Sequence, residues 1–286
     1  RWASIVVNCL VCFPLMAIGK LGMSPEARPL VPNDPNHSLP YNEDAQLPFS
    51  SVYMFAAPVC LILLACELWA PWRRPLVADR VATGLQIGFA ALEGCFLNAA
   101  ITELCKGAFG VMRPDFQDRC LGVAWPELLP ADTDTAVCTG EEKRINDGLR
   151  SFPSGHQSMA VAIAFFLALY FAWVAAARRP NPKSLSRCAN ESYDVLGLLG
   201  FLPMAWAFWV GVTRVQDFRH TPADIAMGVL VGLMASVFCF FRVSGMLRGQ
   251  WSHGGAVEAP LQDSAGQWER GQSNPLAGSP VPSTDA

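Results

Sequence analysis

Six long apolar runs constrain the fold of this chain more than any other feature of its sequence. A helix needs about 20 apolar residues to cross a bilayer, and each run is close to that length. Since lipid offers the backbone no hydrogen-bond partner, runs of this kind are expected to be helical, and the sequence predicts an all-α, polytopic membrane helix bundle. The six expected spans are approximately Trp2–Gly19, Phe49–Ala70, Val81–Cys105, Gln157–Ala177, Val195–Thr213 and Ala223–Phe241.

The composition agrees with a membrane protein and gives no reason to expect a nucleic-acid partner. Of the 286 residues, 52% are hydrophobic and 16% are charged, and the formal net charge is −3. A nucleic-acid-binding chain usually carries a clear excess of positive charge. Three acids, Glu67, Glu93 and Glu103, lie inside the apolar runs, and we expect them to be hydrogen-bonded in the bundle interior.

Residues 1–248 are expected to form one six-span membrane domain, followed by a disordered cytosolic tail over residues 249–286, which is rich in Gly, Pro and Ser. The chain starts at Arg1, directly before an apolar run, so we expect it to be a fragment or a processed form. The first run is long for a signal peptide and has no obvious cleavage site, so we interpret it as a span.

Basic residues in the short connections predict which ends of the spans face the cytosol, because short basic loops stay there. The other loops, after the first, third and fifth spans, are then extracytoplasmic. Asn36 is a glycosylation acceptor on that side, whereas Asn190 lies on the cytosolic side and is expected to stay unmodified. The basic residues of the cytosolic segments are Arg73, Arg74, Arg80, Arg178, Arg179, Lys183, Arg187, Arg242 and Arg248.

Three clusters of polar residues lie at the ends of expected spans. Consecutive spans alternate in direction, so the end of the third, the start of the fourth, the end of the fifth and the start of the sixth share one face of the membrane. The spacing therefore predicts that the clusters converge. They are Lys106 with Arg113, then Ser154-Gly155-His156, then Arg214, His220 and Asp224.

The residue types in these clusters suit a phosphoryl group. The first and third clusters supply three cations, and guanidinium groups match phosphate oxygens. A helix that begins after Ser154 would add a hydroxyl, the N–H of Gly155 and the positive end of its dipole. Two histidines can act as nucleophile and proton donor, and Asp224 can orient one of them. Together these groups favour a phosphoryl-transfer site.

Each cluster also has an ordinary structural interpretation. Ser154–Gln157 has the pattern of a capping box, and so has Thr221–Asp224, with Pro222 at the first helical position. Lys106 and Arg113 are also explained as cations that snorkel to the membrane interface. Independent caps and snorkelling cations need not share one face at this spacing, so their combination favours a site.

The three clusters resemble the signature of the type 2 phosphatidic acid phosphatase superfamily, which includes lipid phosphate phosphatases and vanadium haloperoxidases. The resemblance covers roughly residues 106–241, and the six-span plan extends it over most of the chain. Arg113-Pro114-Asp115-Phe116 with Cys120, followed by Cys138-Thr139-Gly140, looks like the eukaryotic lipid phosphate phosphatase branch.

The resemblance implies a role for each residue of the signature. His220 would attack phosphorus and become a phosphohistidine, Asp224 would hold its imidazole, and His156 would protonate the leaving alkoxide and then activate water. No metal or other cofactor is expected, because basic residues take the place of a divalent ion. The residues implied to bind the phosphate and its pentacoordinate transition state are Lys106, Arg113, Ser154, Gly155 and Arg214.

The sequence departs from the family pattern at four positions. The residue before the third-cluster Arg is Thr213 instead of Ser, and Thr221 follows His220 where many relatives have a second His. Met112 and Val111 stand where relatives often carry another Arg. We expect these positions to lie near the lipid headgroup, so the departures weaken any prediction of the exact substrate but leave the chemistry intact.

Two cysteines, Cys120 and Cys138, share the long third loop. If that loop lies in a secretory compartment, its surroundings are oxidising and a disulfide between them is expected. The alternative is a pair of free thiols.

We therefore predict an integral membrane phosphoric monoester hydrolase that acts without metal on phosphatidate, lysophosphatidate or diacylglycerol pyrophosphate at the extracytoplasmic face. A polyprenyl-pyrophosphate or sphingoid-phosphate phosphatase stays open. A transporter would have paired half-helices near the midplane, whereas the polar clusters of this chain lie at the ends of the expected spans. The retention of both histidines and Asp224 argues against a catalytically silent lipid-binding relative. The sequence leaves open a homo-oligomer and the choice between plasma membrane and a secretory or vacuolar organelle.

Overall fold

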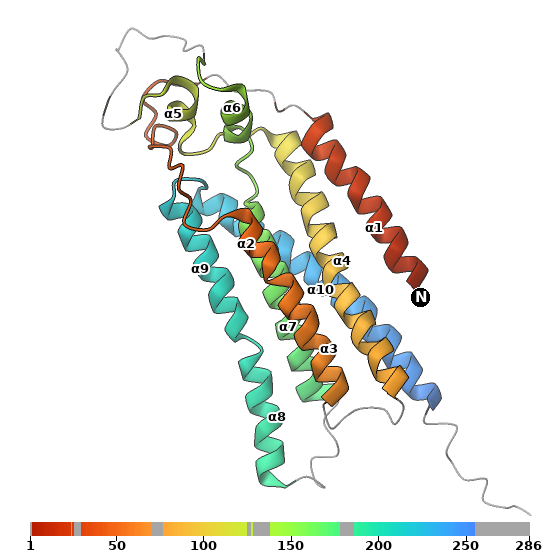
Figure 1. Cartoon of the computed structure of the whole chain (residues 1–286). Helices are drawn as coiled ribbons and strands as arrows, with labels where there is room; N and C mark the ends of the chain where they lie inside the picture. Colours follow the sequence, from red (N-terminus) through yellow and green to blue (C-terminus); the bar gives the residue numbers. More distant parts are fainter. Residues whose placement is uncertain are drawn as a thin grey trace, which may run out of the picture. The chain divides into compact units, whose positions relative to one another are not determined.

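The structure is a computed structural model that describes residues 2–23, 25, 30–69, 77–124, 127, 138–177 and 186–254. Across these ranges the regular structure is helical, without strands, which confirms the predicted all-α class (Figure 1). The elements are α1 (Trp2–Ala17), a π-helix η1 (Ile18–Gly22), α2 (Phe49–Met54), α3 (Ala56–Trp69), α4 (Val77–Phe109), α5 (Phe116–Leu121), α6 (Glu142–Gly148), α7 (Gly155–Ala177), α8 (Arg187–Leu199), α9 (Leu202–Gln216) and α10 (Pro222–Gly254).

Five segments of the described chain are long and apolar enough to cross a membrane, and they correspond to the second to sixth expected spans. The first apolar run forms a shorter apolar helical stretch, Val6–Gly22. Two spans are each built from two helices, α2 with α3 and α8 with α9. The five segments are Phe49–Leu68, Arg80–Phe109, Gly155–Ala176, Arg187–Gln216 and Pro222–Gly245.

The chain divides into two compact units, Arg1–Ser244 and Gly245–Ala286, and the site lies in the first. Helix α10 continues to Gly254, so residues 249–254 of the expected tail are helical. The rest of that tail, residues 255–286, lies outside the described residues, as do the expected cytosolic basic residues Arg73, Arg74, Arg178, Arg179 and Lys183.

Helix α7 is the central element, because it packs against α4, α8 and α9. Helix α10 approaches it closely at two glycines. A Cβ on Gly232 would lie 2.5 Å from the Ser158 carbonyl oxygen, and one on Gly228 would lie 2.8 Å from the Ser154 carbonyl oxygen. Only a residue without a side chain permits this approach, which brings the start of α10 beside the start of α7.

The buried acids are paired, as the sequence predicts. Glu67 accepts a hydrogen bond from the Tyr170 hydroxyl at 2.8 Å. Glu93, which is 2% exposed, accepts hydrogen bonds from Asn8 and Arg242. Burial of an ionised carboxylate is costly unless donors surround it, so these contacts fix α1, α4 and α10 together at Glu93.

The third loop forms a small subdomain around α5 and α6. Its apolar cluster contains Met112, Phe116, Cys120 and Leu149, and Cys120 is joined to Cys138 by a disulfide. Met112 was expected near the headgroup, but it is 5% exposed and packs in this cluster. The departure from the family pattern at this position therefore fills the loop core and does not face a ligand.

Candidate active site

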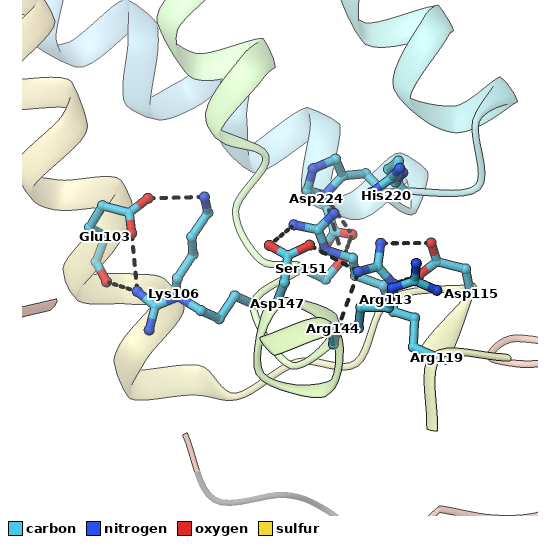
Figure 2. A network of polar contacts seen from close by, with 12 residues as sticks. Glu103, Lys106, Arg113, Asp115, Arg119, Arg144, Asp147, Ser151, His220 and Asp224 are labelled. Carbon is cyan, nitrogen blue, oxygen red and sulfur yellow. Dashed lines mark hydrogen bonds and ion pairs between the residues drawn. The ribbon is translucent and has the colours of Figure 1, made fainter. Parts of the chain in front are cut away.

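The three polar clusters lie where α4 and α9 end and α7 and α10 begin. Figure 2 shows Lys106 and Arg113 of the first cluster and His220 and Asp224 of the third. The Lys106 amine is 3.1 Å from the point where a Cβ would stand on Gly155. The charges of Arg214, Lys106 and Arg113 all act on His156. The convergence predicted from the alternation of spans is therefore present in the fold.

The Asp224 carboxylate contacts two groups at the start of α10. It closes a capping box, because the Thr221 N–H donates to Asp224 Oδ2 at 2.8 Å and the Asp224 N–H donates to Thr221 Oγ1 at 3.2 Å. The same Oδ2 atom is 3.7 Å from His220 Nδ1. The capping interpretation of this residue is confirmed, and the position of its carboxylate is compatible with the catalytic interpretation.

Ser151 completes the surroundings of the His220 imidazole. Its hydroxyl donates to Asp224 Oδ2 at 2.7 Å and lies 3.5 Å from His220 Nδ1. Ser151 is fully buried, and the sequence reasoning assigned it no function. Because Nδ1 faces Ser151 and Asp224, the other ring nitrogen, Nε2, is the one available for chemistry.

His220 is 3% exposed and neutral at physiological pH. Burial lowers the pKa of His220 to about 4, the positive charges of Arg113 and Lys106 act in the same direction, and Asp224 opposes them. A neutral imidazole carries the lone pair that a nucleophile needs.

Arg214 is 1% exposed, and its guanidinium is held by Thr213 on α9 and by Asp217 directly after that helix. Its Nη2 donates to Asp217 Oδ2 at 2.9 Å, and its Nε donates to Thr213 Oγ1 at 3.3 Å. Thr213 thus supplies a hydroxyl to Arg214 at the position where the family pattern has Ser. Asp217 Oδ2 also accepts from the backbone N–H of Gln46 at 3.1 Å, so the first loop closes over this side.

Arg113 is paired with Asp147 of α6. Its Nη2 donates to Asp147 Oδ1 at 3.0 Å, while Arg119 donates to Asp147 Oδ2 at 2.9 Å and binds Asp115 through two hydrogen bonds (Figure 2). Burial alone would raise the pKa of Asp147, but the charges of Arg113 and Arg119 lower it below its ordinary value. The third-loop subdomain therefore positions Arg113 through an ionised carboxylate.

Lys106 is paired with Glu103 on the same helix. The amine donates to Glu103 Oε1 at 3.0 Å, and Arg150 donates to Glu103 Oε2 at 3.1 Å and to the carbonyl oxygen of Gly19 at 2.8 Å. Glu103 therefore joins the end of α4 to the segment before α7.

Each of the three expected phosphate-binding cations is thus held by a carboxylate that the sequence reasoning did not assign to the site. Two of them, Glu103 and Asp217, stand three residues from their partners on a helix, a spacing that brings side chains together and could have identified them. Asp147 lies 34 residues from Arg113, and no local pattern in the sequence connects the two.

His156 lies in the first turn of α7, with Phe49 edge-on at 4.8 Å between ring centroids. Its buried Nε2 has no hydrogen-bond partner among the described residues, and the same is true of Arg113 Nε. Orphaned buried polar atoms are uncommon in proteins. Each of these two atoms is therefore a candidate contact for a polar ligand.

Ser154 caps α7 in part. The Gln157 N–H donates to Ser154 Oγ at 3.5 Å, which is a long contact. The Ser154 N–H donates to the Asp224 carbonyl oxygen at 3.0 Å instead of to the Gln157 side chain. The expected reciprocal capping box is therefore wrong in its second half, because α10 supplies the acceptor.

Two further expected sites lie apart from this constellation. The Cys120–Cys138 disulfide belongs to the third-loop subdomain. Asn36 is exposed in the first loop, where its amide bonds Asp34, and the ring of the next residue, His37, lies 3.2 Å from the Arg113 carbonyl oxygen.

A profile of the PAP2 superfamily matches residues 87–245, which include all three clusters. The chain belongs to the PAP2 superfamily. Membership confirms the resemblance seen in the sequence. Among solved structures, none matches this chain.

Relatives within the PAP2 superfamily point to the lipid phosphate phosphatase branch. The chain is 31% identical to probable lipid phosphate phosphatase 4 of Arabidopsis thaliana, over 70% of this chain and 61% of that protein. It is 30% identical to diacylglycerol pyrophosphate phosphatase 1 of Saccharomyces cerevisiae, over 85% and 80%, and 25% identical to phospholipid phosphatase 1 of Mus musculus, over 80% and 80%. It spans 61% of the first of these proteins and 55% of lipid phosphate phosphatase 1 of Arabidopsis thaliana, less than two thirds of either.

Proposed function

We propose that this integral membrane protein hydrolyses phosphomonoesters of lipids through a phosphohistidine intermediate. The observation that carries the proposal is the pairing of two unlike histidines across one cationic space. His220 is neutral and held at Nδ1, whereas His156 Nε2 is buried without a partner in the described chain. Membership in the PAP2 superfamily and the names of the relatives support the same activity.

In the first step, the lone pair of His220 Nε2 attacks phosphorus and forms a P–N bond. The bond between phosphorus and the lipid oxygen breaks, and that oxygen takes a proton from His156, whose protonated form a bound phosphate dianion favours. Asp224 stabilises the positive charge that develops on His220, because its carboxylate faces Nδ1. The cations and donors that stabilise the equatorial oxygens are Lys106, Arg113, Arg214, Ser154 and the Gly155 N–H.

In the second step, water attacks the phosphohistidine. His156, now neutral, takes a proton from the water as it forms the new P–O bond, the P–N bond breaks, and inorganic phosphate leaves. Both steps use one acid–base residue in opposite directions, and the resulting neutral His220 is ready for another turnover.

The proposed substrates are phosphatidate, lysophosphatidate and diacylglycerol pyrophosphate, and the proposed site of action is the extracytoplasmic membrane face. The spans would hold the acyl chains while the headgroup enters the cationic space at the helix ends. Catalysis is proposed to need no metal, because Lys and Arg side chains supply the positive charge that a divalent ion would bring. On this topology Asn36 is a glycosylation site.

The test is phosphate release by detergent-purified protein from a panel of phosphorylated lipids, including sphingoid and polyprenyl phosphates, with ³²P-labelled substrate to trap the intermediate. We expect His220→Ala to lower turnover by about four orders of magnitude or more and to remove the acid-labile label. His253→Ala is the matched control, since no step uses that residue, and it should behave as wild type.

Two outcomes would contradict the proposal. Wild-type turnover by the His220→Ala variant would rule out this nucleophile. Loss of activity in EDTA that only magnesium restores would rule out metal independence while leaving the lipid phosphatase activity in place.

A further inference from the structure

Two cavities lined by described residues lie beside the helix ends that carry the site. One, here called the α9–α10 cavity, has a volume of about 370 Å³, and its lining includes Gln157, Gly211, Val212, Pro222, Ile225 and Val229. The other, here called the α4–α7 cavity, has a volume of about 90 Å³. Its lining comes from α1, η1, α2, α4 and α7, namely Met16, Lys20, Phe49, Asn98, Ala99, Thr102, Glu103, Gly155, Ser158 and Met159.

The direction of the proposed reaction distinguishes the two cavities. Attacking and leaving atoms lie roughly in line through phosphorus, so the lipid oxygen departs away from His220. The α9–α10 cavity is lined by Pro222 and Ile225, which flank Asp224, the partner of His220, and by Gln157 of α7. The α4–α7 cavity is lined by Gly155 and by Phe49, whose ring packs on His156, the proposed acid. The leaving group therefore belongs in the α4–α7 cavity.

The α4–α7 cavity contains a buried amide that needs a partner. Asn98 is 1% exposed, and its Oδ1 finds no hydrogen-bond partner in the part of the chain that the structure describes. Its neighbours on the cavity wall do not satisfy it, because Thr102 Oγ1 and Ser158 Oγ lie 3.2 Å apart and pair with each other. An unpaired buried amide is costly, so a polar group of a ligand is the expected partner.

The position of Asn98 fits a group close to the phosphoester. Lys106, Thr102 and Asn98 are spaced by four residues and lie on one face of α4. The point where a Cβ would stand on Gly155 is 3.1 Å from the Lys106 amine and 3.6 Å from Thr102 Cγ2, so the phosphate cradle reaches the level of Thr102. Asn98 lies four residues further along α4, about 6 Å. That is the reach of a backbone hydroxyl next to a phosphoester.

Resting on the proposed function, we infer that the α4–α7 cavity binds the carbon backbone of the leaving alcohol and that Asn98 hydrogen-bonds a free hydroxyl on it. A hydroxyl can donate to the amide oxygen or accept from the amide nitrogen, so the pairing holds for either orientation of the side chain. Lysophosphatidate carries such a hydroxyl, whereas in phosphatidate it is esterified. The site therefore favours lysophosphatidate, and Asn98 determines that preference.

The experiment compares lysophosphatidate with its 2-deoxy analogue of the same acyl chain, in mixed micelles, with wild type and Asn98→Leu. Wild type should lose about tenfold in kcat/KM on the deoxy analogue, the usual effect of one unmade hydrogen bond. Asn98→Leu should lose about tenfold on lysophosphatidate and nothing further on the analogue. Both substrates are measured on one preparation, so the ratio does not depend on the fraction of protein that is folded.

Val212→Leu, in the other cavity, is the matched control and should keep the wild-type ratio. Asn98→Ala removes the same amide with a smaller side chain and serves if Asn98→Leu does not accumulate. Equal kcat/KM of wild type on the two substrates would overturn the inference and leave the phosphatase activity standing. A change of the ratio in Val212→Leu as large as in Asn98→Leu would also overturn it. Failure of wild type to hydrolyse any lipid phosphate would instead refute the proposed function.

Discussion

The two sides of the site differ in whether their polar side chains find hydrogen-bond partners within the protein. On the His220 side, Asp224 Oδ2 receives the Ser151 hydroxyl and the Thr221 N–H and faces the imidazole. On the His156 side, neither His156 Nε2 nor Asn98 Oδ1 has a partner within the described ranges. The comparison teaches that the proposed nucleophile is held in place by the protein itself, whereas the proposed acid and the proposed leaving-group cavity keep polar atoms that a substrate would pair.

Removal of His156 tests this asymmetry with the largest expected effect. His156→Ala should slow lipid phosphate hydrolysis by about 10²–10⁴-fold, because an alkoxide leaves poorly without a proton. With p-nitrophenyl phosphate the first step should be nearly unaffected, since a nitrophenolate leaves unprotonated, and phosphoenzyme should accumulate. Rapid-quench measurement of labelled phosphoenzyme checks this. Equal slowing of the first step for both substrates would place the acid elsewhere.

The protonation of His220 gives a second, pH-dependent test. Burial lowers the pKa of His220 to about 4, so the nucleophilic fraction should fall about tenfold per pH unit only below that value. The sign for stability follows: the folded state keeps this ring neutral while the unfolded state protonates it near 6.5, so stability should fall as pH drops from about 6.5 to 4. NMR titration of the ring protons, assigned by substitution of each of the four histidines, measures the midpoint. A midpoint near 6.5 would contradict the burial of the nucleophile.

Ser151 gives the smallest of the three effects. Ser151→Ala should lower kcat about tenfold, because Asp224 loses one of its two donors and holds the imidazole less firmly. The pKa of His220 should rise, since a less solvated carboxylate stabilises the imidazolium more strongly. Ser236→Ala, another buried serine hydrogen-bonded to Ala162 and Gly232, is the control and should leave the titration unchanged. A fall in kcat without movement of the His220 midpoint would reduce Ser151 to a packing role.

Much of the site could be predicted because its residues stand at helix ends. The alternation of spans alone places Lys106, His156 and His220 together, and the Thr221–Asp224 pattern correctly predicts the cap of α10. Charge and hydropathy patterns extend over many residues, so predictions made from them do not depend on individual side-chain contacts.

The sequence could not predict which residues of other elements hydrogen-bond to the site residues. Asp147 reaches Arg113 only because α6 folds back within the third loop, and Ser151 reaches Asp224 only because glycines let α10 approach α7. The capping pattern at Ser154 failed for the same reason, since a neighbouring helix supplied the acceptor. Contacts between elements depend on tertiary packing, which local patterns do not encode.

Asp224 contacts both the first turn of α10 and the His220 imidazole, so the folding of that turn and the orientation of the imidazole depend on one carboxylate. Fraying of the first turn of α10 releases the Thr221 contact and withdraws the carboxylate from the imidazole in one motion. Gentle warming should therefore abolish the proposed activity before the helix bundle unfolds. A tightly bound phosphate mimic should protect the first turn of α10 from fraying before it stabilises the rest of the bundle.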